Sequence, residues 1–112
     1  MRFSDVRIFE LHAEFCKILS SAKRLMIIEL LAKKEMSVSE IAQALQLQHS
    51  NVSQHLTVLR SHNVVESRKE GQTVYYSLTN ATLPKVCAEI RRILLEGMAK
   101  RGSKVKRLIG AK

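Results

Sequence analysis

The side chains best suited to chemistry in this sequence lie between positions 48 and 60. Val52, Leu56 and Leu59 are spaced four and three residues apart, so they would line the buried stripe of a helix. An ordinary solvent-facing helix would fill its other side with Glu and Lys, whereas this one has short polar groups. Amides and hydroxyls of this kind suit base edges and phosphate oxygens. The candidate contacts are Gln48, His49, Ser50, Asn51, Ser53, Gln54, His55 and Arg60.

Catalytic patterns are weak in the rest of the chain. Asp and Glu are scattered, the Ser and His residues gather on one helix without an acid to orient them, and no glycine-rich phosphate loop occurs. The two cysteines, Cys16 and Cys87, have no Cys-x-x-Cys spacing and are too few for a secreted disulfide framework. We therefore expect no enzyme, no cofactor and two reduced thiols.

Composition points to an anionic partner. The 112 residues are 46% hydrophobic, enough for one compact domain, and carry 19 Lys and Arg against 10 Asp and Glu, a net charge of +9. Only 4% are aromatic, which disfavours single-strand binding by base stacking. No apolar run reaches the ~20 residues of a membrane span, and the first residues lack the apolar core of a secretory signal. These features predict a cytoplasmic protein that binds double-stranded DNA and no membrane.

Two helices are predicted before the polar one. Ser4 and Asp5 can cap a first helix that runs to about Leu19 and is apolar on more than one side. One face of that helix would therefore meet a second subunit. Ser20 or Ser21 can cap a second helix, whose predicted core stripe is Leu25, Ile28, Leu31 and Ala32.

A short third helix and a tight turn precede the polar helix. Ser37 and Glu40 have the spacing of a capping box, in which the Ser hydroxyl accepts from the Glu amide and the Glu side chain reaches back. Ile41, Ala42 and Leu45 form the apolar face that follows. Residues 45–48 are just long enough for a turn, so the third and fourth helices predict a helix-turn-helix.

After Arg60 the apolar residues no longer have helical spacing but alternate with polar ones, as in a strand. Val65–Lys69 and Thr73–Leu78 predict a hairpin with Gly71 at its charged tip. Asn63 can end the preceding helix in a left-handed conformation. A last helix runs from about Thr82, with Pro84 in its first turn, to about Lys100. Residues 1–100 would form one domain for DNA binding and dimerisation, and 101–112 a basic, mobile tail.

A helix-turn-helix followed by a basic hairpin is a winged helix, and three stretches resemble the ArsR/SmtB-type repressors. These are KRLMIIELL, SVSEIAQALQLQHSNVSQHLTVLRSHNVV and SRKEGQTVYYSL. The resemblance implies a mainly α fold in the order α-α-α-α-β-β-α and a homodimer joined by the first and last helices. It also implies that two recognition helices enter successive major grooves of a near-palindromic operator.

Further DNA contacts are predicted outside the fourth helix. We expect Ser37 and Ser39 of the third helix to contribute, and Arg68, Lys69 and Gln72 of the wing to grip phosphate or the minor groove. A solvated charge run is the alternative for the wing. Within the fourth helix, Asn51 and Gln54 can pair with adenine.

The signal that such a repressor senses is less well marked. Many metal-sensing members carry Cys-x-Cys where this chain has Ser37 and Ser39, and the last helix lacks the His of the family's other metal site. Cys16 and Cys87 therefore remain, either as packing residues or as a thiol switch for an oxidant or reactive sulfur. Persulfide-responsive members place the upstream cysteine in the second helix, where this chain has Ile28 and Glu29. A weaker alternative is a metal site of His12, Cys16 and Cys87.

Overall fold

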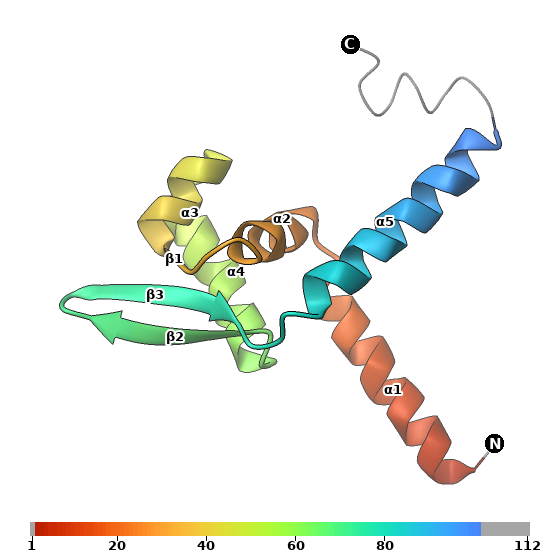
Figure 1. The fold of residues 1–112 in the computed structure, drawn as a ribbon. Helices are drawn as coiled ribbons and strands as arrows, with labels where there is room; N and C mark the ends of the chain where they lie inside the picture. The colour runs from red at the N-terminus through yellow and green to blue at the C-terminus, as the bar shows by residue number, and fades with distance from the viewer. Residues whose placement is uncertain (1, 102–112) are drawn as a thin grey trace. The chain divides into compact units, whose positions relative to one another are not determined.

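The computed structural model describes residues 2–101, so the predicted tail lies outside the described residues beyond its first position. Within the described part the chain forms five helices and three strands (Figure 1). It divides into two compact units, the first ending at Ala81 and the second beginning at Thr82. The elements, in order, are α1 (Phe3–Ile18), α2 (Ala22–Leu31), β1 (Met36–Ser37), α3 (Val38–Leu45), α4 (His49–Ser61), β2 (Val65–Glu70), β3 (Thr73–Leu78) and α5 (Leu83–Ala99).

Strand β1 was missing from the predicted order. Met36 and Ser37 pair with Tyr76 and Tyr75 of β3, so the hairpin becomes a three-stranded antiparallel sheet in the order β1-β3-β2. Two residues are too short for a strand pattern to appear in the sequence, because alternation needs about four residues or more to be recognised. The strand ties the helix-turn-helix to the hairpin and therefore helps to position the wing.

The core of the first unit lies where α2, α3 and α4 meet. Ile27, Ile41, Val52, Leu56 and Leu59 are fully buried there. Burying such a side chain contributes about 1.5–3 kcal/mol, so these residues fix the arrangement of the three helices. The predicted stripe of α4 is confirmed, whereas that of α2 needs correction. Ile27 is buried, Leu25 is only partly buried, and Ala32 is exposed at the C-cap because α2 ends at Leu31.

Local backbone signals form the turn between α3 and α4. The capping box is confirmed: the Glu40 N–H donates to Ser37 Oγ at 3.2 Å and the Ser37 N–H donates to Glu40 Oε1 at 2.9 Å. Gln46 then takes a left-handed conformation with φ 55°, and the Leu47 N–H donates to the Ala42 carbonyl at 3.0 Å. This hydrogen bond gives a backbone carbonyl at the end of α3 a partner, and the left-handed residue turns the chain directly into α4.

The wing is a regular hairpin. Strand β3 has the predicted bounds, and β2 runs one residue further than predicted, to Glu70. Glu70 pairs with Thr73, and Gly71 occupies a positive φ of 63° between them. Asn63 has φ 59° after α4, which confirms its predicted left-handed conformation.

The first and last helices expose more large apolar side chains than any other element of the described chain. Helix α1 begins earlier than predicted, because its N-cap is Arg2, whose N–H donates to Asp5 Oδ2 at 2.8 Å. Helix α5 has Pro84 in its first turn, as predicted. None of the described helices is long and apolar enough to cross a membrane. The exposed apolar residues are Val6, Ile8, Phe9, Leu11 and Phe15 of α1 and Val86, Ile90, Ile93, Leu94 and Leu95 of α5.

Candidate nucleic-acid interface

The polar face of α4 is open to solvent on the side opposite the core. Ser50, Ser53 and Gln54 are exposed, whereas Val52 and Leu56 on the other side of the helix are completely buried. Gln48, His49 and Arg60 are also exposed. The buried stripe therefore fixes the rotation of the helix, and that rotation presents the amide and hydroxyl groups outward.

Two polar residues of α4 are held partly inside. The Asn51 side chain is half-buried, and its Oδ1 is enclosed with no hydrogen-bond partner among the described residues. Pairing of Asn51 with adenine through both side-chain groups therefore requires a rotation of the side chain, because adenine must donate to this oxygen. His55 is half-buried as well, and its ring nitrogen Nδ1 lies 3.2 Å from Nε of Arg24.

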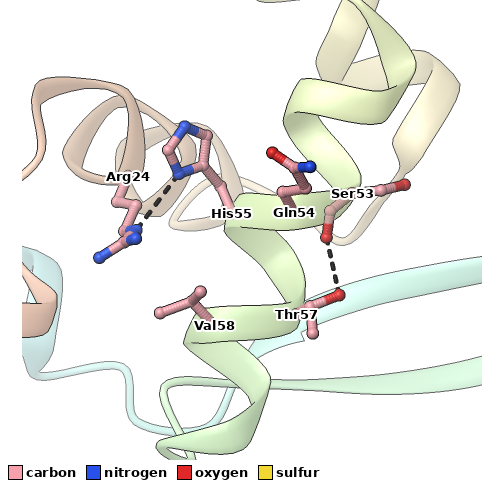
Figure 2. A pocket seen from close by; sticks show the side chains of 6 residues that line it. All are labelled: Arg24, Ser53, Gln54, His55, Thr57 and Val58. Atoms are coloured by element: carbon pink, nitrogen blue, oxygen red, sulfur yellow. Dashed lines mark hydrogen bonds between the residues drawn. The ribbon is translucent and has the colours of Figure 1, made fainter.

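Arg24 and His55 line a groove along the flank of α4 (Figure 2). The groove has a volume of about 520 Å³, and its other lining residues are Ser53, Gln54, Thr57 and Val58. Partial burial and the positive charges of Arg24 and Lys23 lower the pKa of His55. His55 is therefore a neutral imidazole at neutral pH, and it accepts a hydrogen bond from Arg24.

The two positively charged residues of the wing, Arg68 and Lys69, differ in whether an acidic side chain pairs with them. Arg68 Nε lies 3.0 and 2.9 Å from the two carboxylate oxygens of Glu35, and Nη2 also contacts this carboxylate. The guanidinium lies 4.9 Å from the ring centre of Tyr75. Hydrogen bonding between the two groups raises the pKa of Arg68 and lowers that of Glu35. Lys69 is exposed and has no ion pair within the described residues.

Known regulatory proteins are similar to most of this chain. Residues 21–67 match the family described as "Bacterial regulatory protein, arsR family". The HTH-type transcriptional regulator Rv0081 of Mycobacterium tuberculosis is 35% identical over 95 residues, which cover 84% of this chain and 83% of that protein. The chain belongs to the ArsR family. It is a DNA-binding transcriptional regulator, since its relatives are regulators and not enzymes.

Solved ArsR-family structures confirm the winged helix-turn-helix fold. The crystal structure of Rv0081 has a TM-score of 0.77 at 34% identity and covers 86% of this chain and 97% of that one. The homodimeric winged helix-turn-helix domain of Mb0332 from Mycobacterium bovis has a TM-score of 0.76 at 26% identity, with 92% and 95% covered. The transcriptional repressor BigR from Xylella fastidiosa has a TM-score of 0.70 at 30% identity, with 83% and 92% covered.

Two residues that were predicted to contact DNA, Ser37 and Arg68, have partners within the protein. Ser37 is only 8% exposed, and its hydroxyl already accepts from the Glu40 amide. It therefore serves as the cap of α3 and presents little surface to DNA, whereas Ser39 is exposed. Arg68 is tied to Glu35, a partner that sequence reasoning missed because the two residues are far apart in the chain. Gln72 is exposed at the tip of the wing.

The predicted sensor residues differ in accessibility. Cys16 is exposed, whereas Cys87 is buried. His12 is exposed on α1. In the part of the chain that the structure describes, no three His, Cys, Asp or Glu side chains gather where they could hold a metal ion. The His12, Cys16 and Cys87 alternative therefore gains no support from the structure.

Proposed function

We propose that this ArsR-family regulator is a homodimeric repressor that binds a near-palindromic operator in the cytoplasm. Residues 1–100 would serve for both DNA binding and dimerisation. The observation that carries the proposal is the exposed polar face of α4, since the buried stripe behind it fixes which side chains can reach a major groove. The relative BigR is named a repressor, which supports the direction of regulation.

The exposed apolar faces of α1 and α5 support a second copy of this chain as the dimer partner. Phe9 is 54% exposed in α1, and Ile90 and Ile93 are 59% and 63% exposed in α5. Exposed apolar patches of this kind mark association surfaces, because covering them removes apolar area from water. The homodimeric relative Mb0332 adds support.

The proposed DNA contacts fall into two groups. Side chains of α4 would read bases and hold phosphates: His49, Ser50, Ser53, Gln54 and His55 directly, and Asn51 after a rotation of its amide. Lys69 and Gln72 would contact the backbone or minor groove from the wing. Gln48, Ser39 and Arg60 are exposed at the edges of this surface and would contribute phosphate contacts.

We further propose that a thiol signal releases the operator. Cys16 is exposed and would react first. Its thiolate attacks peroxide to give a sulfenic acid and hydroxide, and the Cys87 thiol then displaces the sulfenic oxygen as water to form a disulfide. In total the two thiols lose two electrons and two protons, and one peroxide becomes two waters. A metal signal or constitutive binding without an effector are the alternative functions.

The test is a fluorescence-anisotropy titration of a duplex taken from upstream of the gene for this chain. The expected result is tighter binding to this duplex than to a random duplex of equal length, with affinity falling steeply as salt rises. Equal affinity for the two duplexes would refute the proposal of sequence-specific regulation.

The signal is tested by repeating the titration after treatment with peroxide, polysulfide or Zn(II). Peroxide or polysulfide should weaken binding by the wild type, and Cys16→Ser and Cys87→Ser should each abolish that response. A response to Zn(II) alone would favour the metal alternative. If peroxide, polysulfide and Zn(II) all leave DNA binding unchanged, the alternative of constitutive binding without an effector is favoured.

A further inference from the structure

The contact between Arg24 and His55 joins two elements that are distant in the sequence. Arg24 lies in the first turn of α2, and His55 lies at the middle of α4. The guanidinium Nε donates to His55 Nδ1 at 3.2 Å, and Nη1 donates to the carbonyl of Ile18 at 3.0 Å. Arg24 is thus held at two points, and its Nη2 makes no hydrogen bond within the described residues.

This contact determines where the proton of His55 resides. An arginine side chain has no acceptor and stays protonated, so Nε must be the donor. Nδ1 must then carry the lone pair, and the neutral ring carries its proton on Nε2. Nε2 lies on the far side of the ring from the Arg24 contact (Figure 2). His55 therefore presents an N–H donor away from Arg24.

The electrostatic surroundings maintain this state. The charged groups that act on His55 are Arg24 and Lys23 of α2, both cations, and partial burial adds to their effect. All three causes lower the pKa of His55, which keeps the ring neutral. The region therefore has positive potential and donor groups, a combination that suits an anion.

We propose that His55 donates from Nε2 to a backbone phosphate of DNA, and that Arg24 completes this subsite as a positioning residue that fixes the tautomer with its proton on Nε2. The site rests on the proposed DNA-binding function of α4 and deepens it. The groove of about 520 Å³ that both residues line offers access beside the recognition helix. Nε2 of His55 supplies the donor to the phosphate. Arg24 acts as a positioning residue through its bond to Nδ1.

A phosphate suits this place better than a base edge. Arg24 comes from α2, and its Nη1 is anchored on the Ile18 carbonyl, so its reach is limited to the flank of α4. Ser50 is exposed on α4 outside the groove lining and is available for bases, whereas Ser53 and Gln54 are exposed at the groove itself. Contacts beside a recognition helix typically go to phosphate and set the register of the helix in the groove.

The first test is a double-mutant cycle in DNA binding. Arg24→Gln and His55→Gln should each weaken binding to the upstream duplex and to a random duplex by about tenfold, the effect of losing one charge-assisted hydrogen bond. Because Arg24 acts through His55, the double variant should bind about as well as either single variant. Purely additive losses would overturn the proposal, as would an unchanged affinity in either single variant.

Lys23→Gln is the matched control, since it removes the same charge from the neighbouring position of α2 without removing a hydrogen bond to His55. Its loss of affinity should be smaller and should add to that of His55→Gln. If Arg24→Gln and Lys23→Gln behave alike, only the general positive potential matters and the subsite does not exist. Circular dichroism checks that each variant is folded, and Arg24→Met, which keeps the apolar stem but has no donor, replaces Arg24→Gln if the latter unfolds.

The second test needs no DNA. A long-range ¹H–¹⁵N correlation spectrum of the free protein distinguishes protonated from unprotonated ring nitrogens, and His55→Gln assigns the signals among the 4 histidines. The wild type and Lys23→Gln should show His55 protonated on Nε2 and unprotonated on Nδ1 at neutral pH. Arg24→Gln should lose this preference and raise the pKa of His55. A His55 ring that is protonated on Nδ1 in the wild type would overturn the proposal.

These tests separate the subsite from the proposed function. If the wild type shows no preference for the upstream duplex, sequence-specific regulation fails, yet the cycle on random duplex and the spectrum still decide the subsite, because phosphate contacts are independent of sequence. Conversely, specific binding with additive losses would retain the regulator and reject the subsite.

Discussion

Two substitutions in the wing and one at Glu35, which lies just before β1, should have different effects on the salt dependence of DNA binding. Lys69 is exposed without an ion pair in the described residues, so its charge can neutralise a phosphate. Arg68 already has its charge compensated by Glu35, whose two carboxylate oxygens lie 3.0 and 2.9 Å from Nε. Two positively charged wing residues one position apart are therefore predicted to differ in function.

The magnitude follows from counterion release. Each neutralised phosphate contributes about 0.9 to the slope of log affinity against log salt concentration, so a dimer loses about 1.8 with Lys69→Gln. Arg68→Gln should lower the slope by less than half as much, because breaking the contact with Glu35 offsets what Arg68 could gain from a phosphate. Glu35→Gln should raise the affinity and steepen the slope, since it removes the bidentate partner of Arg68 and leaves only the ion pair with Glu70, at 3.6 Å.

The assay is an anisotropy titration of each variant on a random duplex at several salt concentrations, with circular dichroism as the check of folding. Equal losses of slope for Arg68→Gln and Lys69→Gln would refute the reasoning, because they would show that DNA displaces Glu35 at no cost. A Glu35→Gln variant with unchanged affinity and slope would contradict it as well.

Three further predictions concern the dimer, the cap of α3 and the pH dependence of stability. Ile90→Lys places a charge on the exposed apolar face of α5 and should weaken dimerisation by about 1 kcal/mol or more per copy, as measured by analytical ultracentrifugation. An unchanged dimerisation constant would place the interface elsewhere. Ser37→Ala removes the acceptor for the Glu40 amide and should lower the free energy of unfolding by about 1 kcal/mol, whereas Ser39→Ala should change it by less than about 0.5 kcal/mol. If the two serine variants are equally stable in urea, the cap is not important. The pKa of His55 is lowered in the folded protein, so its contribution to stability is present above about pH 6.5 and is lost as pH falls through the pKa of the folded state. His55→Gln should therefore make the free energy of unfolding less dependent on pH between about 7 and 5. Equally steep pH profiles for the wild type and the variant would exclude His55 as the cause.

Periodicity and local turn chemistry were sufficient to predict most of the fold. The stripe of Val52, Leu56 and Leu59 specified both the existence and the rotation of α4, because burial of one face exposes the opposite one. The capping box at Ser37 and the left-handed Asn63 are local signals that need no tertiary information. The ends of elements were less predictable: α1 starts at an Arg cap, which is an uncommon cap residue.

Contacts between distant segments account for what the sequence could not predict. The pairings of Arg68 with Glu35 and of Arg24 with His55 join residues 33 and 31 positions apart, so no local pattern reveals them. The two-residue strand β1 exists only because β3 offers it a partner. The charge of Arg68 predicted a phosphate contact, but the nearby carboxylate already compensates that charge.

The central proposal, that a twofold pair of these chains presents two α4 helices to adjacent major grooves, is tested most directly by changing the spacing of the operator. Footprinting first defines the two half-sites, whose centres should lie about one helical turn, roughly 10 base pairs, apart. Inserting about half a turn of DNA between them rotates one half-site to the opposite face of the duplex. We expect this insertion to reduce affinity to the level of a random duplex. Unchanged affinity for the operator with the insertion would contradict the proposal.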